Sequence, residues 1–160
     1  MTDFVPLSWS PLGTHPTLGN VAWNTVDAAI TEVPGGAGIN WQNAFLPVNA
    51  LPPLAGAESV AIGDDVFKVG RTTGLTGGTV TSIRTVVGPV GYGRQQASFQ
   101  NSIEIVSTGA GAFSGPGDSG SAIVKVANNK VVALLYAGNG TQTYACRIDL
   151  VLSALGCALA

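Results

Sequence analysis

Short runs of apolar and β-branched residues, separated by glycine or asparagine, dominate the second half of the chain. Six of them have the length and composition of β-strands and span residues 65–69, 78–87, 96–106, 121–126, 130–137 and 143–148. Asn128 and Asn129 stand between two of these runs, and asparagine tolerates the positive φ of a hairpin turn. The pattern therefore predicts a series of antiparallel strands.

The end of the chain changes to a helical period. Leu152, Leu155 and Leu159 recur at helical spacing, and Asp149 precedes them in the position of a helix cap. Gly156 weakens the helix, because glycine is a poor helix former. Strands followed by one helix are typical of a closed antiparallel barrel, so we expect an all-β fold with a short C-terminal helix.

The first third of the chain carries weaker signals. Proline and glycine interrupt residues 1–20, and a short apolar segment follows. Prolines among small side chains then predict a linker at residues 49–56. We expect a small N-terminal segment at residues 1–48 and a β-barrel at residues 57–160.

Composition narrows the class of protein. The chain has 160 residues, of which 46% are hydrophobic and 10% charged, and so low a charge excludes a disordered chain. Seven Lys and Arg against nine Asp and Glu give a net charge of −2, so we expect no electrostatic binding to nucleic acid. No apolar run is long enough for a membrane helix, and residues 1–4 do not look like the start of a signal peptide.

The segment with the clearest chemical meaning is residues 114–120, Ser-Gly-Pro-Gly-Asp-Ser-Gly. A serine between glycines can sit on a tight turn with its hydroxyl exposed. The N–H groups of Gly117 and Ser119 would then form an oxyanion hole, where each donor contributes a factor of roughly 10²–10³ in rate. Asp118 would be partly buried and would need a partner.

Residues 117–121, followed by an apolar strand, resemble the nucleophile turn of trypsin-like serine peptidases of the chymotrypsin fold. Residues 68–80 resemble the opening hairpin of the second barrel in the bacterial alpha-lytic protease and streptogrisin group. Residues 134–138 and 143–145 resemble the substrate-binding strand and the strand before the closing helix. The resemblance implies a chymotrypsin-like antiparallel β-barrel, complete at the C-terminal side and partial at the N-terminal side.

The resemblance also implies a catalytic triad in the order His, Asp, Ser. Ser119 takes the nucleophile position, and the segment around Asp27 resembles the one that holds the aspartate, although Asp27 also fits a turn cap. The single histidine, His15, lies in surroundings that do not match the family. Three alternatives stay open: another chain or segment carries the histidine, the mechanism is lost, or His15 is recruited from a loop.

A basic residue neutralises the aspartate before the serine in the bacterial group. Lys68 matches that position, and Arg71 is close by and has the better geometry for a buried carboxylate. We expect Lys68 or Arg71 within ion-pair distance of Asp118.

By the same resemblance, the pocket for the residue before the cleaved bond is floored and walled by five residues, Phe113, Ser114, Tyr136, Ala137 and Gly138. The Phe113 position holds no acid, which favours a small or apolar residue over Lys or Arg in the substrate. Phe67 and Gly77 stand where a family disulfide would be. We interpret Cys146 and Cys157 as small buried apolar residues.

Two functions from different classes follow. The first is a serine endopeptidase, or part of one, that acts on a polypeptide through an acyl-enzyme on Ser119. The second is a catalytically inactive module for binding, self-assembly or complementation by a partner chain that completes the N-terminal barrel. We expect no cofactor, no metal and no membrane association, and the resemblance to secreted bacterial enzymes favours an extracellular location.

Overall fold

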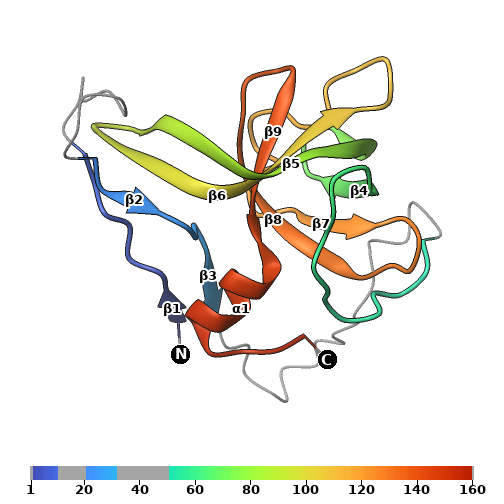
Figure 1. The fold of residues 1–160 in the computed structure, drawn as a ribbon, viewed down its shortest axis with the longest axis horizontal. Coiled ribbons are helices and arrows are strands. Elements are labelled where there is room, and N and C mark those ends of the chain that lie inside the picture. The colour runs from blue at the N-terminus through green and yellow to red at the C-terminus, as the bar shows by residue number, and fades with distance from the viewer. Residues whose placement is uncertain (1, 11–20, 32–50, 160) are drawn as a thin grey trace.

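Six strands close into an antiparallel barrel in the computed structural model, which describes residues 2–10, 21–31 and 51–159 (Figure 1). They are β4 (Asp65–Gly70), β5 (Gly74–Tyr92), β6 (Gln95–Ser107), β7 (Ala122–Lys125), β8 (Val131–Gly138) and β9 (Gln142–Arg147). Their order in the sheet is β6-β5-β4-β7-β8-β9, and β9 pairs back onto β6. This closure removes the free edges of the sheet within the barrel.

Alternating apolar residues fill the barrel. Val66, Ile105 and Ile123 have no exposed surface, because every second side chain of a strand points inward. The predicted all-β barrel is confirmed, and no helix in the described ranges is both long and apolar enough to cross a membrane.

The short helix α1 (Ile148–Leu155) packs against β8 and β9 and buries Ile148 and Val151. It ends at Gly156, which has a φ of 62°, a left-handed conformation that glycine adopts easily. The predicted cap at Asp149 is wrong. Arg147 stands at the cap position, and Asp149 lies in the first turn, where a negative charge is favourable at the positive end of the helix dipole.

The hairpin of β5 and β6 is much longer than the sequence suggests. β4 pairs with β5 only as far as Thr79, and the remainder of β5 pairs with β6 up to Tyr92. We call residues 83–99, which project beyond the barrel, the arm. The predicted strand ended at residue 87, before Gly88 and Pro89, but the ladder shifts register between Val87 and Val90 and so accommodates the proline.

The N-terminal part is small and rests on the barrel and the arm. β1 (Thr2–Phe4) pairs with β3 (Ala29–Thr31), and β2 (Trp23–Asn24) runs parallel to β6. The Asn24 amide donates to the carbonyl oxygens of Ser8 at 2.9 Å and Ser98 at 3.1 Å. Residues 51–56 carry no strand, and the boundaries at 48, 49 and 57 stay predictions.

Candidate active site

Ser119 lies on the exposed turn between β6 and β7. Asp118 N–H donates to Gly115 O at 3.0 Å, which closes a turn with Pro116 and Gly117 at its centre. Gly117 has a φ of 100°, and Pro followed by a positive-φ residue is the signature of a type II turn. The local sequence thus explains why the chain reverses here.

The backbone amides around Ser119 are used unequally. The N–H groups of Gly120 and Ser121 donate to carbonyl oxygens at 2.7 and 3.0 Å. Within the part of the chain that the structure describes, the N–H groups of Gly117 and Ser119 have no acceptor. These are the two donors that the sequence analysis assigned to an oxyanion hole.

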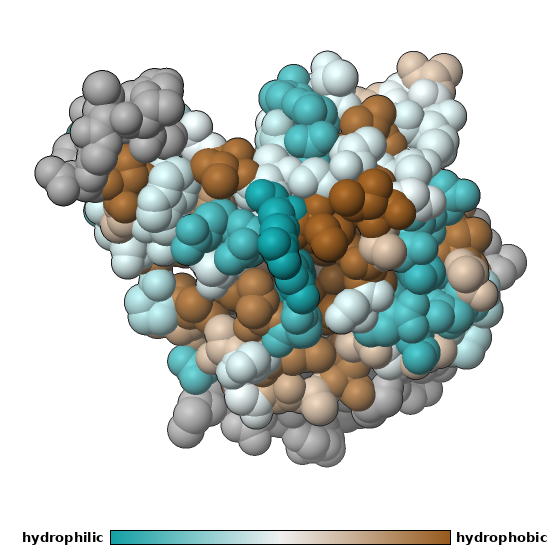
Figure 2. Space-filling model, in the orientation of Figure 1, coloured by the Kyte–Doolittle hydropathy of each residue, from teal (hydrophilic) through white to brown (hydrophobic). Residues whose placement is uncertain are grey.

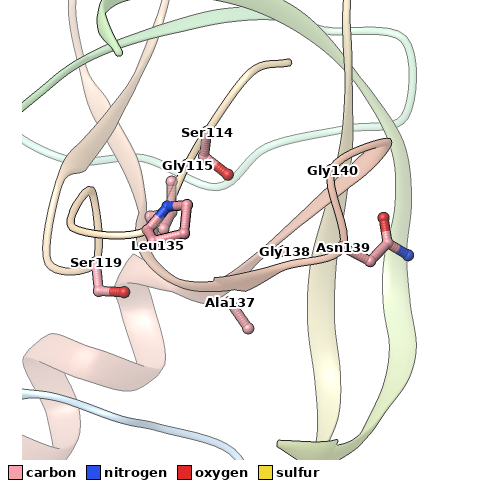
Figure 3. Close-up of a pocket in the computed structure, with 9 residues that line it drawn as sticks. Ser114, Gly115, Ser119, Leu135, Ala137, Gly138, Asn139 and Gly140 are labelled. Carbon is pink, nitrogen blue, oxygen red and sulfur yellow. The ribbon is translucent and has the colours of Figure 1, made fainter. Parts of the chain in front are cut away.

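The Ser119 hydroxyl points from the turn toward β8 (Figure 3). Its Oγ donates to the carbonyl oxygen of Tyr136 at 3.4 Å, a long and therefore weak hydrogen bond. The hydroxyl is therefore held by one weak hydrogen bond on an exposed residue.

Beneath the turn, Asp118 is fully buried and accepts several hydrogen bonds. Its Oδ1 accepts from Thr72 N–H at 2.7 Å, and its Oδ2 accepts from Gly115 N–H at 3.0 Å and from Thr73 Oγ at 2.6 Å. Lys68 Nζ lies 3.5 Å from Oδ2, and both side chains have no exposed surface. The carboxylate therefore fastens the turn to the loop between β4 and β5.

Burial and hydrogen bonding oppose each other in this pair. Burial raises the pKa of Asp118, but the bonds from Thr73, Gly115 and Thr72 outweigh it and hold the pKa below its ordinary value of 3.8. Burial lowers the pKa of Lys68 more than the Asp118 charge raises it. Lys68 has fewer compensating contacts, because among the described residues it donates, besides Asp118, only to Thr73 Oγ and to Gly74 O.

Of the two predicted partners, the structure therefore brings Lys68 to Asp118. Arg71 is exposed, and its guanidinium lies against Gly117, where a Cβ would collide with it. Lys68 Nζ also lies 5.7 Å from the centre of the Phe113 ring. This cation–π contact further stabilises the buried ammonium group.

A cavity of about 300 Å³ opens beside Ser119 (Figure 3). Three residues predicted for the substrate pocket line it, namely Ser114, Ala137 and Gly138. The buried hydroxyl of Ser114, one of the lining residues, lies 2.6 Å from that of Thr143, and the two form a hydrogen bond. None of the described residues that line the cavity carries a charge.

Phe113 and Tyr136, also predicted to line this pocket, lie elsewhere. The Phe113 side chain is 1% exposed and belongs to the barrel core. Tyr136 is buried against Phe99, with ring centres 4.4 Å apart, and its hydroxyl lies 2.8 Å from Ser102 Oγ. The ladder between β8 and β9 shifts register between Leu135 and Ala137, so simple alternation does not predict which side Tyr136 faces.

The sequence analysis missed five residues of the cavity, Gly115, Pro116, Leu135, Asn139 and Gly140. The first four are next to predicted site residues in the sequence, and Gly140 is two positions from Gly138. Their proximity to Gly138 and Ser119 was the available signal.

Asp27 lies at the N-terminal side of the site and is half-buried. Its N–H donates to Cys146 Sγ at 3.2 Å, and its Oδ2 accepts from Tyr92 OH at 2.6 Å. Burial is the main cause of the raised pKa of Tyr136, and the negative charge of Asp27 adds to it. Through Cys146, Asp27 contacts β9, the strand that pairs with β8.

The described ranges contain no histidine, because His15 falls in residues 11–20, outside them. Nor do three His, Cys, Asp or Glu side chains gather anywhere in the described ranges so as to hold a metal ion.

Both cysteines are free thiols. Cys146 is buried, which raises the pKa of its thiol to about 12, whereas Cys157 is partly exposed. Phe67 and Gly77, the positions of the absent disulfide, face each other across the β4–β5 ladder.

Comparison with known proteins places the fold. No family model and no curated protein matches the chain. Among solved structures, a glutamic-acid-specific serine protease matches with a TM-score of 0.63 and 21% identity over 87% of this chain and 70% of its own. Nocardiopsis protease matches with a TM-score of 0.63 and 20% identity over 87% of this chain and 71% of its own. Cellulomonas bogoriensis chymotrypsin matches with a TM-score of 0.61 and 24% identity over 78% of this chain and 65% of its own. The chain has the fold of the bacterial chymotrypsin-like serine proteases.

Proposed function

We propose that the chain is the nucleophile-bearing module of a serine endopeptidase. The observation that carries this proposal is the exposed hydroxyl of Ser119 beside two unpaired N–H groups and an open cavity. A glycine-rich turn with these three features is suited to acyl transfer at a carbonyl group.

In the proposed reaction, Ser119 Oγ attacks the peptide carbonyl carbon and gives its proton to a base. The N–H groups of Gly117 and Ser119 donate to the oxygen that becomes negative. The C–N bond then breaks, the leaving amine takes the proton, and an ester on Ser119 remains. Water hydrolyses this ester by the same steps in reverse order.

The base in this proposal is a histidine that Asp27 orients. A serine hydroxyl at its ordinary pKa needs such a base. His15 or a histidine of another chain supplies the imidazole, and the contact of Asp27 with Tyr92 leaves the carboxylate acceptor sites for it.

The cavity beside Ser119 supports an uncharged side chain in the substrate. A Lys, Arg, Asp or Glu side chain would lose its water there without gaining a charged partner. The Ser114–Thr143 pair adds polarity but no charge. A small or apolar residue therefore fits before the cleaved bond.

The test is labelling with a fluorophosphonate probe, which reacts with activated serines. We expect modification of Ser119, none in Ser119→Ala, and full labelling in Ser121→Ala. Ser121 is a matched control, because it is two residues away and its hydroxyl donates to Asp118 O at 2.6 Å. If Ser119 stays unlabelled in the presence of native partners, the proposal is wrong.

Exposed apolar surface on the N-terminal part favours a second candidate, an inactive module that binds a partner. Phe4 is 64% exposed and Ile30 is 39% exposed. An apolar groove between β3 and α1 is lined by Ile30, Leu152 and Leu155, among others. A partner chain or a second copy that covers this surface would complete the N-terminal barrel. Sedimentation of the purified chain tests this, because a monomer at every concentration excludes self-assembly.

A further inference from the structure

A pocket opens beside Asp27 in the N-terminal part and shares no lining residue with the cavity beside Ser119. It has a volume of about 330 Å³ and is lined by residues 4–7, Trp9 and residues 27–29. β1 and β3 hold these two segments together, because they pair and because Val5 N–H donates to Ala28 O at 3.0 Å. Figure 2 shows apolar and polar surface side by side at the lower left of this face, where Figure 1 places β1 and β3. We call this space the Asp27 pocket.

The charge of Asp27 has no counter-charge in the described part of the chain. Among those residues its carboxylate accepts only from Tyr92 OH, at 2.6 Å, and forms no ion pair. None of the other described residues that line the Asp27 pocket carries a charge. A carboxylate can accept further hydrogen bonds on both oxygens. A half-buried negative charge also attracts a cation more strongly than one surrounded by water.

Two aromatic side chains that line the Asp27 pocket are exposed, Phe4 by 64% and Trp9 by 41%. Trp9 contacts Tyr92 edge-on, with ring centres 5.5 Å apart, and Tyr92 in turn donates to Asp27. Burial, and after it the bond to Asp27, raises the pKa of Tyr92, so the phenol keeps its proton and stays a donor. Tyr92 thus holds Trp9 and the Asp27 carboxylate in a fixed arrangement.

This combination of side chains selects among classes of ligand. The carboxylate repels anions, and one carboxylate among apolar side chains supplies too few oxygen ligands for Ca²⁺ or Mg²⁺. An alkylammonium ion matches every feature. Its N–H groups donate to the carboxylate, its charge is attracted to aromatic rings, and its alkyl stem packs on Pro6 and Leu7.

We propose that the Asp27 pocket binds an alkylammonium group, supplied by a free amine or by a lysine side chain of a polypeptide. The assignment depends on the pocket and not on a peptidase reaction. Where Asp27 also orients a histidine, a bound ammonium competes for the same carboxylate and slows acylation of Ser119. Only this consequence rests on the proposed function.

The test is an NMR titration of the full chain in a buffer without amines. The ligands are n-butylammonium chloride, a lysine blocked at both ends, and 1-butanol as the uncharged analogue. We expect an ammonium ligand to bind about tenfold more tightly than butanol, the scale of a hydrogen bond to a charged group, with shifts at residues 4–9 and 27–29. Tighter binding of blocked lysine assigns a polypeptide as the source, and tighter binding of butylammonium assigns a free amine. An ammonium affinity no better than that of butanol would overturn the proposal.

Asp27→Asn locates the charge effect. The amide oxygen still accepts from Tyr92, but the charge is gone, so we expect ammonium binding to weaken about tenfold and butanol binding to stay the same. Asp65→Asn is the matched control. Asp65 also accepts from a hydroxyl, Thr79 Oγ at 2.8 Å, and lies outside the pocket. Equal ammonium affinities in the two variants would overturn the assignment.

Trp9→Leu tests the aromatic contribution, and we expect it to weaken ammonium binding about threefold. Trp23→Leu is its control, because Trp23 is 36% exposed and does not line the pocket. Equal effects of the two substitutions would contradict a cation–π contact at Trp9. Fluorophosphonate labelling separates this proposal from the peptidase proposal. Ammonium binding without labelling defeats the peptidase proposal alone, and labelling without ammonium binding defeats this one alone.

Discussion

Asp118 and Asp27 are both carboxylates of the candidate site, and the chain holds them in different ways. Asp118 has no exposed side-chain surface and contacts Lys68 and Thr73 inside the barrel. Asp27 is half-buried, and the contacts of its carboxylate and amide are with Tyr92 and Cys146. The Asp118 carboxylate is buried within the closed barrel, whereas the Asp27 carboxylate belongs to the small N-terminal part that packs against the barrel.

The difference concerns how far each part of the candidate site, the Ser119 turn and the surroundings of Asp27, is held in one fixed geometry. Preorganised donors are effective because they need not move when charge develops. The Ser119 turn is held by the buried Asp118, whereas the role proposed for Asp27 needs a histidine, and the described residues include none. We therefore expect larger effects from substitutions on the barrel side of the site, around Asp118 and Ser119, than from substitutions around Asp27.

The largest effect is expected from Lys68→Met. It leaves Asp118 buried without its counter-charge, and breaking a buried pair costs about 3–5 kcal/mol. Thermal unfolding measures the change. The control is Lys130→Met. The Lys130 side chain is 39% exposed and pairs with Glu58 at the surface, so the melting temperature of this variant should hardly change. Equal melting temperatures for the two variants would contradict a structural role for Lys68.

Gly117→Ala tests the turn itself. Gly117 has a φ of 100°, and a Cβ would lie 2.6 Å from Thr72 Oγ, so the turn must rearrange and its N–H must move. We expect fluorophosphonate labelling to slow by about 10²–10³, as for loss of one oxyanion donor. Gly111→Ala, where a Cβ meets open space, should label at the unaltered rate. An unchanged labelling rate in Gly117→Ala would show that the reactivity of Ser119 does not depend on the conformation of this turn.

Acid should weaken the barrel side through Asp118. A carboxylate whose pKa is lowered by folding stabilises the protein above its unfolded pKa, near 3.8, and this contribution is lost as the pH falls below that value. We expect Asp118→Asn to lose less free energy of unfolding than the unaltered chain between about pH 4 and pH 2. Urea denaturation at several pH values measures this. The exposed Asp3→Asn is the control, and a parallel acid profile for Asp118→Asn would refute the argument.

The smallest effect is expected on the N-terminal side. Tyr92→Phe removes the 2.6 Å hydrogen bond to Asp27, which contributes about 0.5–1.5 kcal/mol. Tyr144→Phe, which loses a 3.1 Å bond to Gln142, is the matched control. A loss for Tyr92→Phe as large as that for Lys68→Met would show that the two sides are equally fixed and would break the comparison.

The sequence predicted the position of a residue on the barrel side well where a local motif determined that position. The resemblance to the bacterial hairpin matched Lys68 to the partner of Asp118, and the glycines placed Ser119 on an exposed turn. Tyr136 and Phe113 were misplaced because a register shift in β8 and the packing of an aromatic ring are set by neighbours far away in the chain.

The arm and the N-terminal part were harder to predict for the opposite reason. Gly88, Pro89 and Gly91 are ordinary strand breakers, yet the arm continues through them, because a bulged ladder tolerates such residues. Contacts of β2 with β6 join residues more than seventy positions apart, and no local pattern reports them.

The most direct test of the central claim is a crystal structure of the chain after reaction with a small organophosphate. The account predicts a phosphorus atom bonded to Ser119 Oγ, with one phosphoryl oxygen about 2.7–3.1 Å from the N–H nitrogens of both Gly117 and Ser119. An unmodified Ser119, or a phosphoryl oxygen turned away from those two amides, would contradict it.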